Sequence, residues 1–197
     1  MGVTMSKKVL VIGLDGASYT VLKPWMEDGT LPNMRKISSE GVSGELMSTI
    51  PPVTGPAWAS FMTGKGPGSH GVYDFVKAST NRVNREIVSY NEIKSETIFS
   101  ILTKYKKKVG SVNMPLTYPV PKVDGYLISG LLTPKRERDF TYPLSLLDEL
   151  KSEVGEYIVD VWWQRYDEHA VERFLKRLRF CTEQRMKTSW YLMEHYD

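Results

Sequence analysis

The sequence KKVLVIGLDG, residues 7–16, carries the strongest signal for the fold. It is a nearly continuous apolar run, and Gly13, Asp15 and Gly16 lie at its end. A strand has this pattern when helices cover both of its faces, as in the centre of a parallel sheet. The stretch therefore predicts a central parallel strand with Asp15 at its carboxyl end.

Strand-like and helix-like patterns alternate along the rest of the chain. Short apolar segments predict further strands at residues 41–49, 85–90, 108–114, 125–130 and 157–163. Helical patterns are found at residues 20–29, 31–40, 56–64, 95–105, 144–154 and 167–196. Such alternation predicts an α/β domain with a mostly parallel sheet sandwiched by helices.

The composition is that of a soluble globular protein. Hydrophobic residues make up 41% of the chain and charged residues 25%. Because 26 basic residues are mixed with 23 acidic ones, the net charge of +3 does not favour a nucleic-acid polymer as partner. The apolar stretch 9–14 is too short for a signal peptide or a membrane span, and the single cysteine, Cys181, suits a reducing cytosol. We therefore expect a cytoplasmic location and no membrane partner.

A threonine stands immediately before the third helical pattern, in the sequence PPVTGPAWAS, residues 51–60. One interpretation makes Thr54 an N-cap, whose side-chain oxygen accepts a backbone N–H. In the other, Thr54 is a nucleophile, because the N–H groups and the positive end of the helix would hold a phosphate against its Oγ. Gly55 would let the backbone approach the phosphate, and Pro56 can start a helix although it has no N–H.

A threonine hydroxyl is a weak nucleophile at neutral pH and needs a base or a metal ion. Asp15 is the candidate metal anchor, because ligands of open α/β sheets bind at the carboxyl ends of the strands, where Asp15 and Thr54 are both expected. The sequence around Asp15, GLDGAS, lacks the G-x-G-x-x-G spacing of a dinucleotide fold, and the chain has no G-x-x-x-x-G-K-[ST] motif. The two commonest nucleotide-binding motifs are therefore excluded.

Two stretches together resemble a known family. VLVIGLDGAS, residues 9–18, followed by PPVTGPAWASFMTGKGPGSHGVYDF, residues 51–75, is similar to the type I phosphodiesterase/nucleotide pyrophosphatase branch of the alkaline phosphatase superfamily. The resemblance implies an alkaline-phosphatase-like fold and a phosphoester hydrolase with two divalent metal ions, usually zinc and alternatively manganese. It implies that Asp15 and Thr54 are metal ligands, and that Thr54 attacks phosphorus to form a phosphothreonine. The Gly55 N–H would help to hold a substrate oxygen.

The chain departs from the pattern of this family in two places. Family members complete the metal site with aspartates and histidines from a later segment, and none of His70, His169 and His195 has a metal-binding neighbour at useful spacing. We therefore expect residues 1–197 to be the N-terminal part of such a domain, incomplete at the C-terminus, inactive alone and self-associating. Ala57 stands where a pyrophosphatase would have an asparagine.

Three functions stay open at this point. The leading one is hydrolysis of a phosphoester or nucleotide-like small molecule. The second is a phosphomutase of the same superfamily. The third is a non-catalytic binding or interaction domain, in which Thr54 only caps its helix and KGPGSHG, residues 65–71, is only a loop. Independently of these alternatives, we expect His70 to stabilise its glycine-flanked loop.

Overall fold

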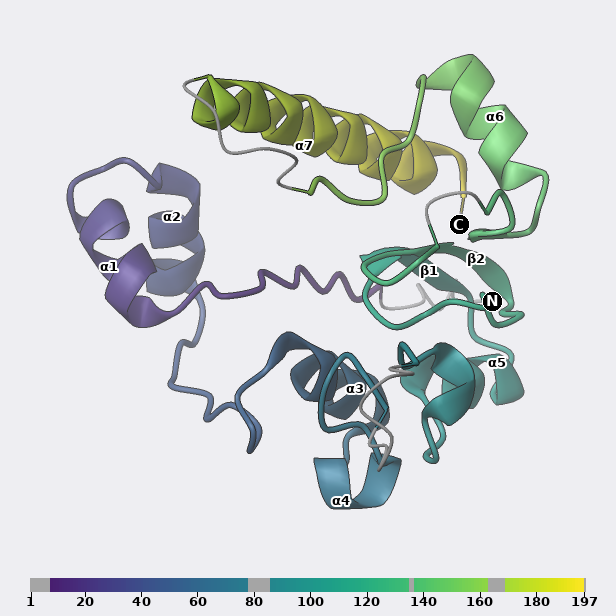
Figure 1. Ribbon diagram of the computed structural model, residues 1–197. Coiled ribbons are helices and arrows are strands. Elements are labelled where there is room, and N and C mark those ends of the chain that lie inside the picture. Colours follow the sequence, from purple (N-terminus) through teal and green to yellow (C-terminus); the bar gives the residue numbers. More distant parts are fainter. Residues whose placement is uncertain (1–7, 78–85, 135–136, 163–168, 197) are drawn as a thin grey trace, which may run out of the picture. The chain divides into compact units, whose positions relative to one another are not determined.

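The computed structural model describes residues 8–77, 86–134, 137–162 and 169–196. The chain divides into two compact units, Met1–Met47 and Ser48–Asp197. In the first unit, helices α1 (Tyr19–Glu27) and α2 (Pro32–Glu40) pack on each other (Figure 1). The second unit contains the other described elements: α3 (Thr54–Thr63), α4 (Pro67–His70), the 3-10 helix η1 (Tyr90–Glu92), α5 (Ile98–Lys104), β1 (Val109–Met114), β2 (Gly125–Ser129), β3 (Thr141–Tyr142), α6 (Leu146–Glu153) and α7 (Ala170–His195).

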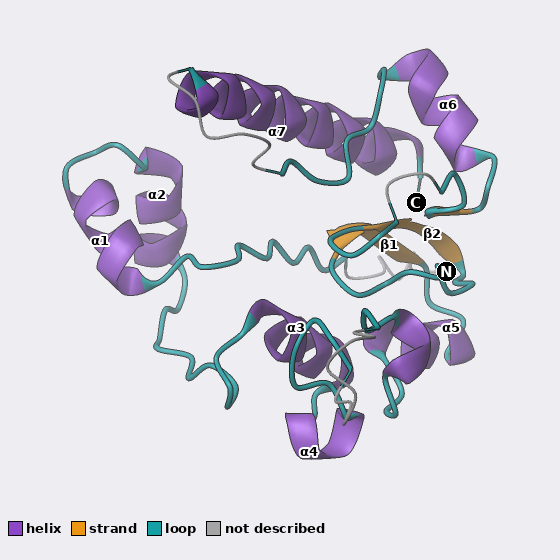
Figure 2. Cartoon of the chain, in the orientation of Figure 1, coloured by secondary structure: helices purple, strands orange, loops and turns teal. Residues whose placement is uncertain are grey.

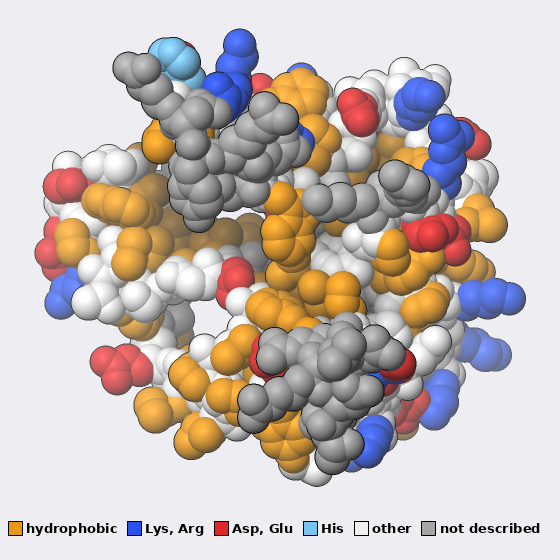
Figure 3. All heavy atoms as spheres, in the orientation of Figure 1, with side chains coloured by type: hydrophobic (Ala, Val, Ile, Leu, Met, Phe, Trp, Pro, Cys, Tyr) orange, Lys and Arg blue, Asp and Glu red, His pale blue; other side chains and the backbone are white. Residues whose placement is uncertain are grey.

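The strand predicted at residues 7–16 is not found. Residues 8–14 are loop (Figure 2), and Val9 is 85% exposed. Residues 41–49, also predicted as a strand, form no strand either, and the side chains of Val42 and Leu46 are almost completely exposed. A strand forms only where a neighbouring strand pairs with its backbone N–H and C=O groups, and neither segment has such pairing among the described residues. Apolar side chains consequently remain at the surface of the described residues (Figure 3).

The sheet of the second unit is small and mixed. β1 and β2 run parallel, in a register that places Ser111 opposite Leu127, and β3 pairs antiparallel with β2. The prediction of a mostly parallel sheet is therefore wrong for the described residues. The reason is that two other predicted strands find no parallel neighbour. Residues 86–90 contribute one antiparallel bridge, and residues 157–162 lie outside the sheet. Residues 85 and 163, which belong to the same two predicted strands, are outside the described part.

Helices cover both faces of this sheet. Leu127 and Ile128 are adjacent in β2 and fully buried, and adjacent strand residues point to opposite faces. Leu127 belongs to a core cluster with Met62 of α3, whereas Ile128 packs in a second cluster with Leu150 of α6 and Leu192 of α7. In Figure 1, α3 and α5 accordingly lie on one side of the sheet, and α6 and α7 lie on the other.

The predicted helices are all present, with ends shifted by a few residues. The longest, α7, joins the core of the unit near its C-terminal end, where Leu192 belongs to the cluster around Ile128. The hydroxyls of Tyr191 and Tyr196 donate to the two carboxylate oxygens of Glu149 in α6, at 3.0 and 2.7 Å. Burial and the carboxylate neighbour raise the pKa of Tyr196 to about 12, and they raise the pKa of Tyr191 as well. Both hydroxyls are therefore protonated and able to donate at neutral pH. No helix of the described residues combines the length and the apolar content needed to cross a bilayer.

Candidate active site

Thr54 is the first residue of α3. The residue at the N-cap position is Val53, whose backbone is extended and whose carbonyl accepts the N–H of Ala57 at 3.1 Å. The interpretation of Thr54 as the N-cap is therefore wrong. At the first helical position, the Thr54 side chain lies in the turn whose N–H groups carry the positive end of the helix dipole.

Gly55 is buried where another segment crosses the first turn of α3. A Cβ on Gly55 would lie 3.3 Å from the carbonyl oxygen of Asp74 and 3.6 Å from the ring of Phe75. A side chain at this position would press on the backbone carbonyl of Asp74. The glycine thus allows the chain to pass directly beside the residue that follows Thr54.

His70 is completely buried at the end of α4, and its hydrogen bonds define its tautomer. The N–H of Val72 donates to Nδ1 at 3.1 Å, so Nδ1 carries no proton. Nε2 therefore carries the proton and donates it to Ser60 Oγ of α3 at 2.9 Å. The expectation that His70 stabilises its glycine-flanked loop is confirmed by the bond from Val72. The link to Ser60 was not predicted, because ten residues separate the two side chains and no short motif connects them.

The buried histidine predicts a loss of stability in mild acid. Burial lowers the pKa of His70 below the usual 6.5, so the unfolded chain takes up this proton at a higher pH than the folded chain. The contribution of neutral His70 to the free energy of unfolding is therefore fully present above pH 6.5, and it is lost as the pH falls through the folded pKa. We expect the urea midpoint of the wild type to fall between about pH 7 and pH 5 more than that of His70→Asn. Equal falls in the two proteins would contradict a titration at His70.

Asp15 and Thr54 lie in different units. Asp15 is exposed in a turn of the first unit, and Thr54 begins α3 in the second. Their approach to each other stays a prediction. His195 is exposed at the end of α7, where its ring stacks on Tyr191 with 4.3 Å between the ring centroids. His169 is exposed just before that helix. Among the described residues, no three His, Cys, Asp or Glu side chains gather as a metal site would require.

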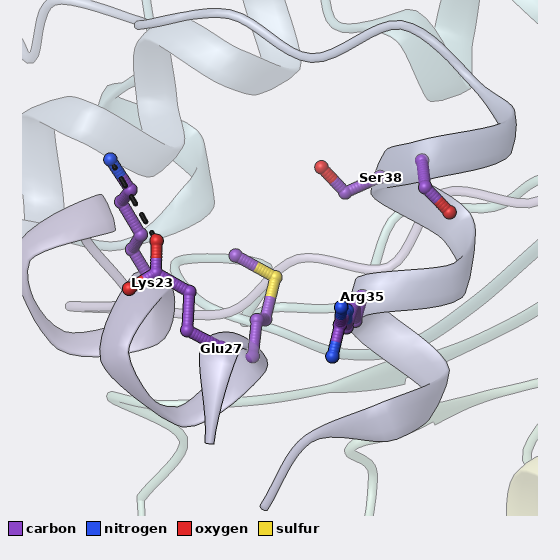
Figure 4. Close-up of a pocket in the computed structure, with 6 residues that line it drawn as sticks. Lys23, Glu27, Arg35 and Ser38 are labelled. Atoms are coloured by element: carbon purple, nitrogen blue, oxygen red, sulfur yellow. Dashed lines mark ion pairs between the residues drawn. The ribbon is translucent and has the colours of Figure 1, made fainter. Parts of the chain in front are cut away.

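A shallow hollow lies between α1 and α2 in the first unit (Figure 4). The side chains of Lys23, Glu27, Arg35 and Ser38 border it, and the Lys23 ammonium pairs with the Glu27 carboxylate at 3.9 Å. Neither Asp15 nor Thr54 is among the residues that line it. The hollow is thus lined by other residues than those that the sequence marks for phosphate chemistry.

Comparison with known proteins identifies a family that the chain matches. The sequence model of the family described as type I phosphodiesterase / nucleotide pyrophosphatase matches residues 9–194. No curated protein and no solved structure matches the chain. The match spans nearly the whole chain and confirms the resemblance seen in residues 9–18 and 51–75.

Proposed function

The chain belongs to the type I phosphodiesterase/nucleotide pyrophosphatase family, and from this premise we propose that it provides the nucleophile of a metal-dependent phosphoester hydrolase. Thr54 is the proposed nucleophile, Asp15 a proposed metal ligand, and Gly55 a proposed donor to a substrate oxygen. The substrate would be a phosphoester or nucleotide-like small molecule in the cytoplasm. The observation that supports this most is that Thr54 opens α3, a helix of ten residues.

The start of α3 suits phosphate chemistry for local reasons. The N–H groups of the first turn point away from the helix, and their dipoles favour an anion at that end. A phosphate held there would lie beside the Thr54 hydroxyl. Attack by Oγ would form a bond to phosphorus as the bond to the leaving oxygen breaks. Water would then cleave the phosphothreonine and restore the hydroxyl.

The metal ions implied by the family need more ligands than the described residues offer. Asp15 would supply a carboxylate oxygen and Thr54 a hydroxyl oxygen, which are donors that suit a divalent cation. Two donors do not hold two ions, and no larger cluster exists in the described part of the chain. The residues present thus do not fit a complete two-metal site.

We expect the purified chain to hydrolyse bis(p-nitrophenyl) phosphate at no more than the background rate, with zinc or manganese supplied. An ion held by one carboxylate and one hydroxyl would be lost to buffer, so the Thr54 hydroxyl would stay a weak nucleophile. The measurement is release of p-nitrophenol by the wild type and by Thr54→Ala. Robust release that Thr54→Ala abolishes would confirm the nucleophile and show that other residues complete the site. Transfer of the phosphoryl group to an added alcohol in preference to water would favour the phosphomutase.

Phosphate binding tests the proposed site without turnover. Inorganic phosphate added to the ¹⁵N-labelled chain is expected to shift the backbone amide signals of Thr54 and Gly55, because these N–H groups would contact it. The amide of Gly66, which precedes the four-residue helix α4, serves as an internal control. Unchanged Thr54 and Gly55 signals at millimolar phosphate would count against the site and favour a non-catalytic domain.

We also propose that the chain self-associates through the N-terminal half of α7. Val171, Leu175 and Leu178 recur at helical spacing and are 57%, 46% and 40% exposed. Sedimentation at micromolar concentration is expected to show dimers or larger species, and the triple change of these residues to serine is expected to give monomers. A wild type that remains a monomer throughout would contradict this proposal.

A further inference from the structure

We infer that His70 is a positioning residue for Thr54: through Ser60 and the backbone of Val72, it holds the first turn of α3 against Asp74. The inference rests on the proposed role of Thr54. The experiment below measures neither phosphate binding nor turnover, so the positioning role of His70 and the proposed role of Thr54 can be contradicted independently.

The first contact acts on α3 directly. His70 Nε2 donates to Ser60 Oγ at 2.9 Å, and Ser60 lies less than two turns after Thr54 on the same helix. Because a helix of this length moves as one rigid element, a bond at Ser60 limits rotation and sliding at Thr54. Ala59, next to Ser60, is completely buried, and it anchors the same part of the helix in the core.

The second contact acts on the segment that crosses the start of α3. His70 Nδ1 accepts the N–H of Val72 at 3.1 Å, and Val72 is itself completely buried. Two residues later, the carbonyl oxygen of Asp74 lies 3.3 Å from the place where Gly55 would carry a Cβ. The contacts form a closed path from His70 through α3 to Gly55, across to Asp74, and back through Val72.

A third contact fixes His70 from another part of the chain. The backbone N–H of Lys94 donates to the His70 carbonyl at 3.0 Å, and the Lys94 side chain lies 3.2 Å from the place of a Cβ on Gly71. Charged residues of the segments that contact residues 69–72 include Lys94 and Glu96, whereas α3 has no charged residue. The ring therefore meets α3 only through neutral groups, as suits an uncharged imidazole.

Hydrogen exchange can separate positioning from general stabilisation. The N–H of Ala57 makes the first backbone bond of α3, to Val53, and its protection reports how well the first turn is held. His70→Asn keeps an acceptor near the Nδ1 position but loses the donor to Ser60. Ser60→Ala removes the acceptor. We expect each change to lower the protection of the Ala57 amide by about fivefold to tenfold, because one buried hydrogen bond is lost.

The matched control is Thr117→Val. Thr117 is buried beyond β1, where its hydroxyl donates to the Met114 carbonyl at 2.8 Å and contacts Ser129 Oγ at 3.1 Å. Its loss is expected to reduce global stability by a similar amount without a selective effect on Ala57. His70→Gln, which places a donor near the Nε2 position, is expected to restore part of the Ala57 protection.

Two outcomes would overturn the inference. One is an equal loss of Ala57 protection in Thr117→Val, which would mean that His70 contributes only to overall stability. The other is an unchanged Ala57 amide in both His70→Asn and Ser60→Ala. If His70→Asn does not fold, Ser60→Ala compared with Thr117→Val decides the question by itself.

Discussion

Replacing Gly130 by alanine is expected to lower the free energy of unfolding by about 3 kcal/mol or more. Gly130 directly follows β2, and its N–H donates to the Met114 carbonyl at 2.9 Å. An added Cβ would lie 2.2 Å from the carbonyl oxygen of Asn113, which is far inside van der Waals contact. Because the clashing atoms belong to the backbone and not to a flexible side chain, the clash can be avoided only if β1 and β2 move apart. Urea unfolding followed by circular dichroism measures the effect.

The control for this change is Gly66→Ala. A Cβ on Gly66 would meet no atom within 4 Å, and its backbone has a negative φ that alanine adopts freely. We expect a change in the free energy of unfolding of less than about 0.5 kcal/mol. Similar urea midpoints for the Gly130 and Gly66 variants would show that the two strands can separate at little cost.

Leu127→Ala is expected to lower the free energy of unfolding by about 2–5 kcal/mol. Leu127 is in β2, is completely buried, and packs in the cluster that contains Ala59 and Met62 of α3. The change removes apolar contacts and leaves a cavity between the sheet and the helix that begins with Thr54. Urea unfolding gives the magnitude, and amide signals of α3 show whether the helix shifts.

Leu144→Ala is the matched control, because it removes the same atoms from a side chain that is 66% exposed. Its expected cost is below about 1 kcal/mol, since little apolar surface is returned to water. If both leucine variants unfold at the same urea concentration, the cluster between α3 and the sheet is not a core of the folded protein.

The helices were predictable from the sequence because their signals are local. Apolar spacing and end residues located α1, α2, α5, α6 and α7 to within a few residues, and the start of α3 was marked by Thr54, Gly55 and Pro56. The strands β1 and β2 were also predicted, because both are short apolar runs bounded by turn residues, whereas their parallel pairing with each other is known only from the structure.

The sheet as a whole was not predictable in the same way. The apolar run at residues 9–14 has the composition of a central strand, yet it forms no strand among the described residues. Composition shows that a segment can pair, whereas pairing itself depends on whether distant segments meet it in register. For the same reason, no sequence pattern indicated that residues 141–142 form the short antiparallel strand β3, which makes the sheet mixed.

The same distinction between local signals and contacts made by folding applies to the candidate site. Sequence alone supplied the family, through the motifs at residues 9–18 and 51–75, and it supplied Thr54 at the start of a helix, because both depend on residues that are neighbours in the chain. The bond from His70 to Ser60 and the crossing of Asp74 beside Gly55 emerged only from folding. Such contacts join residues ten or more positions apart, and packing, not local preference, brings those residues together.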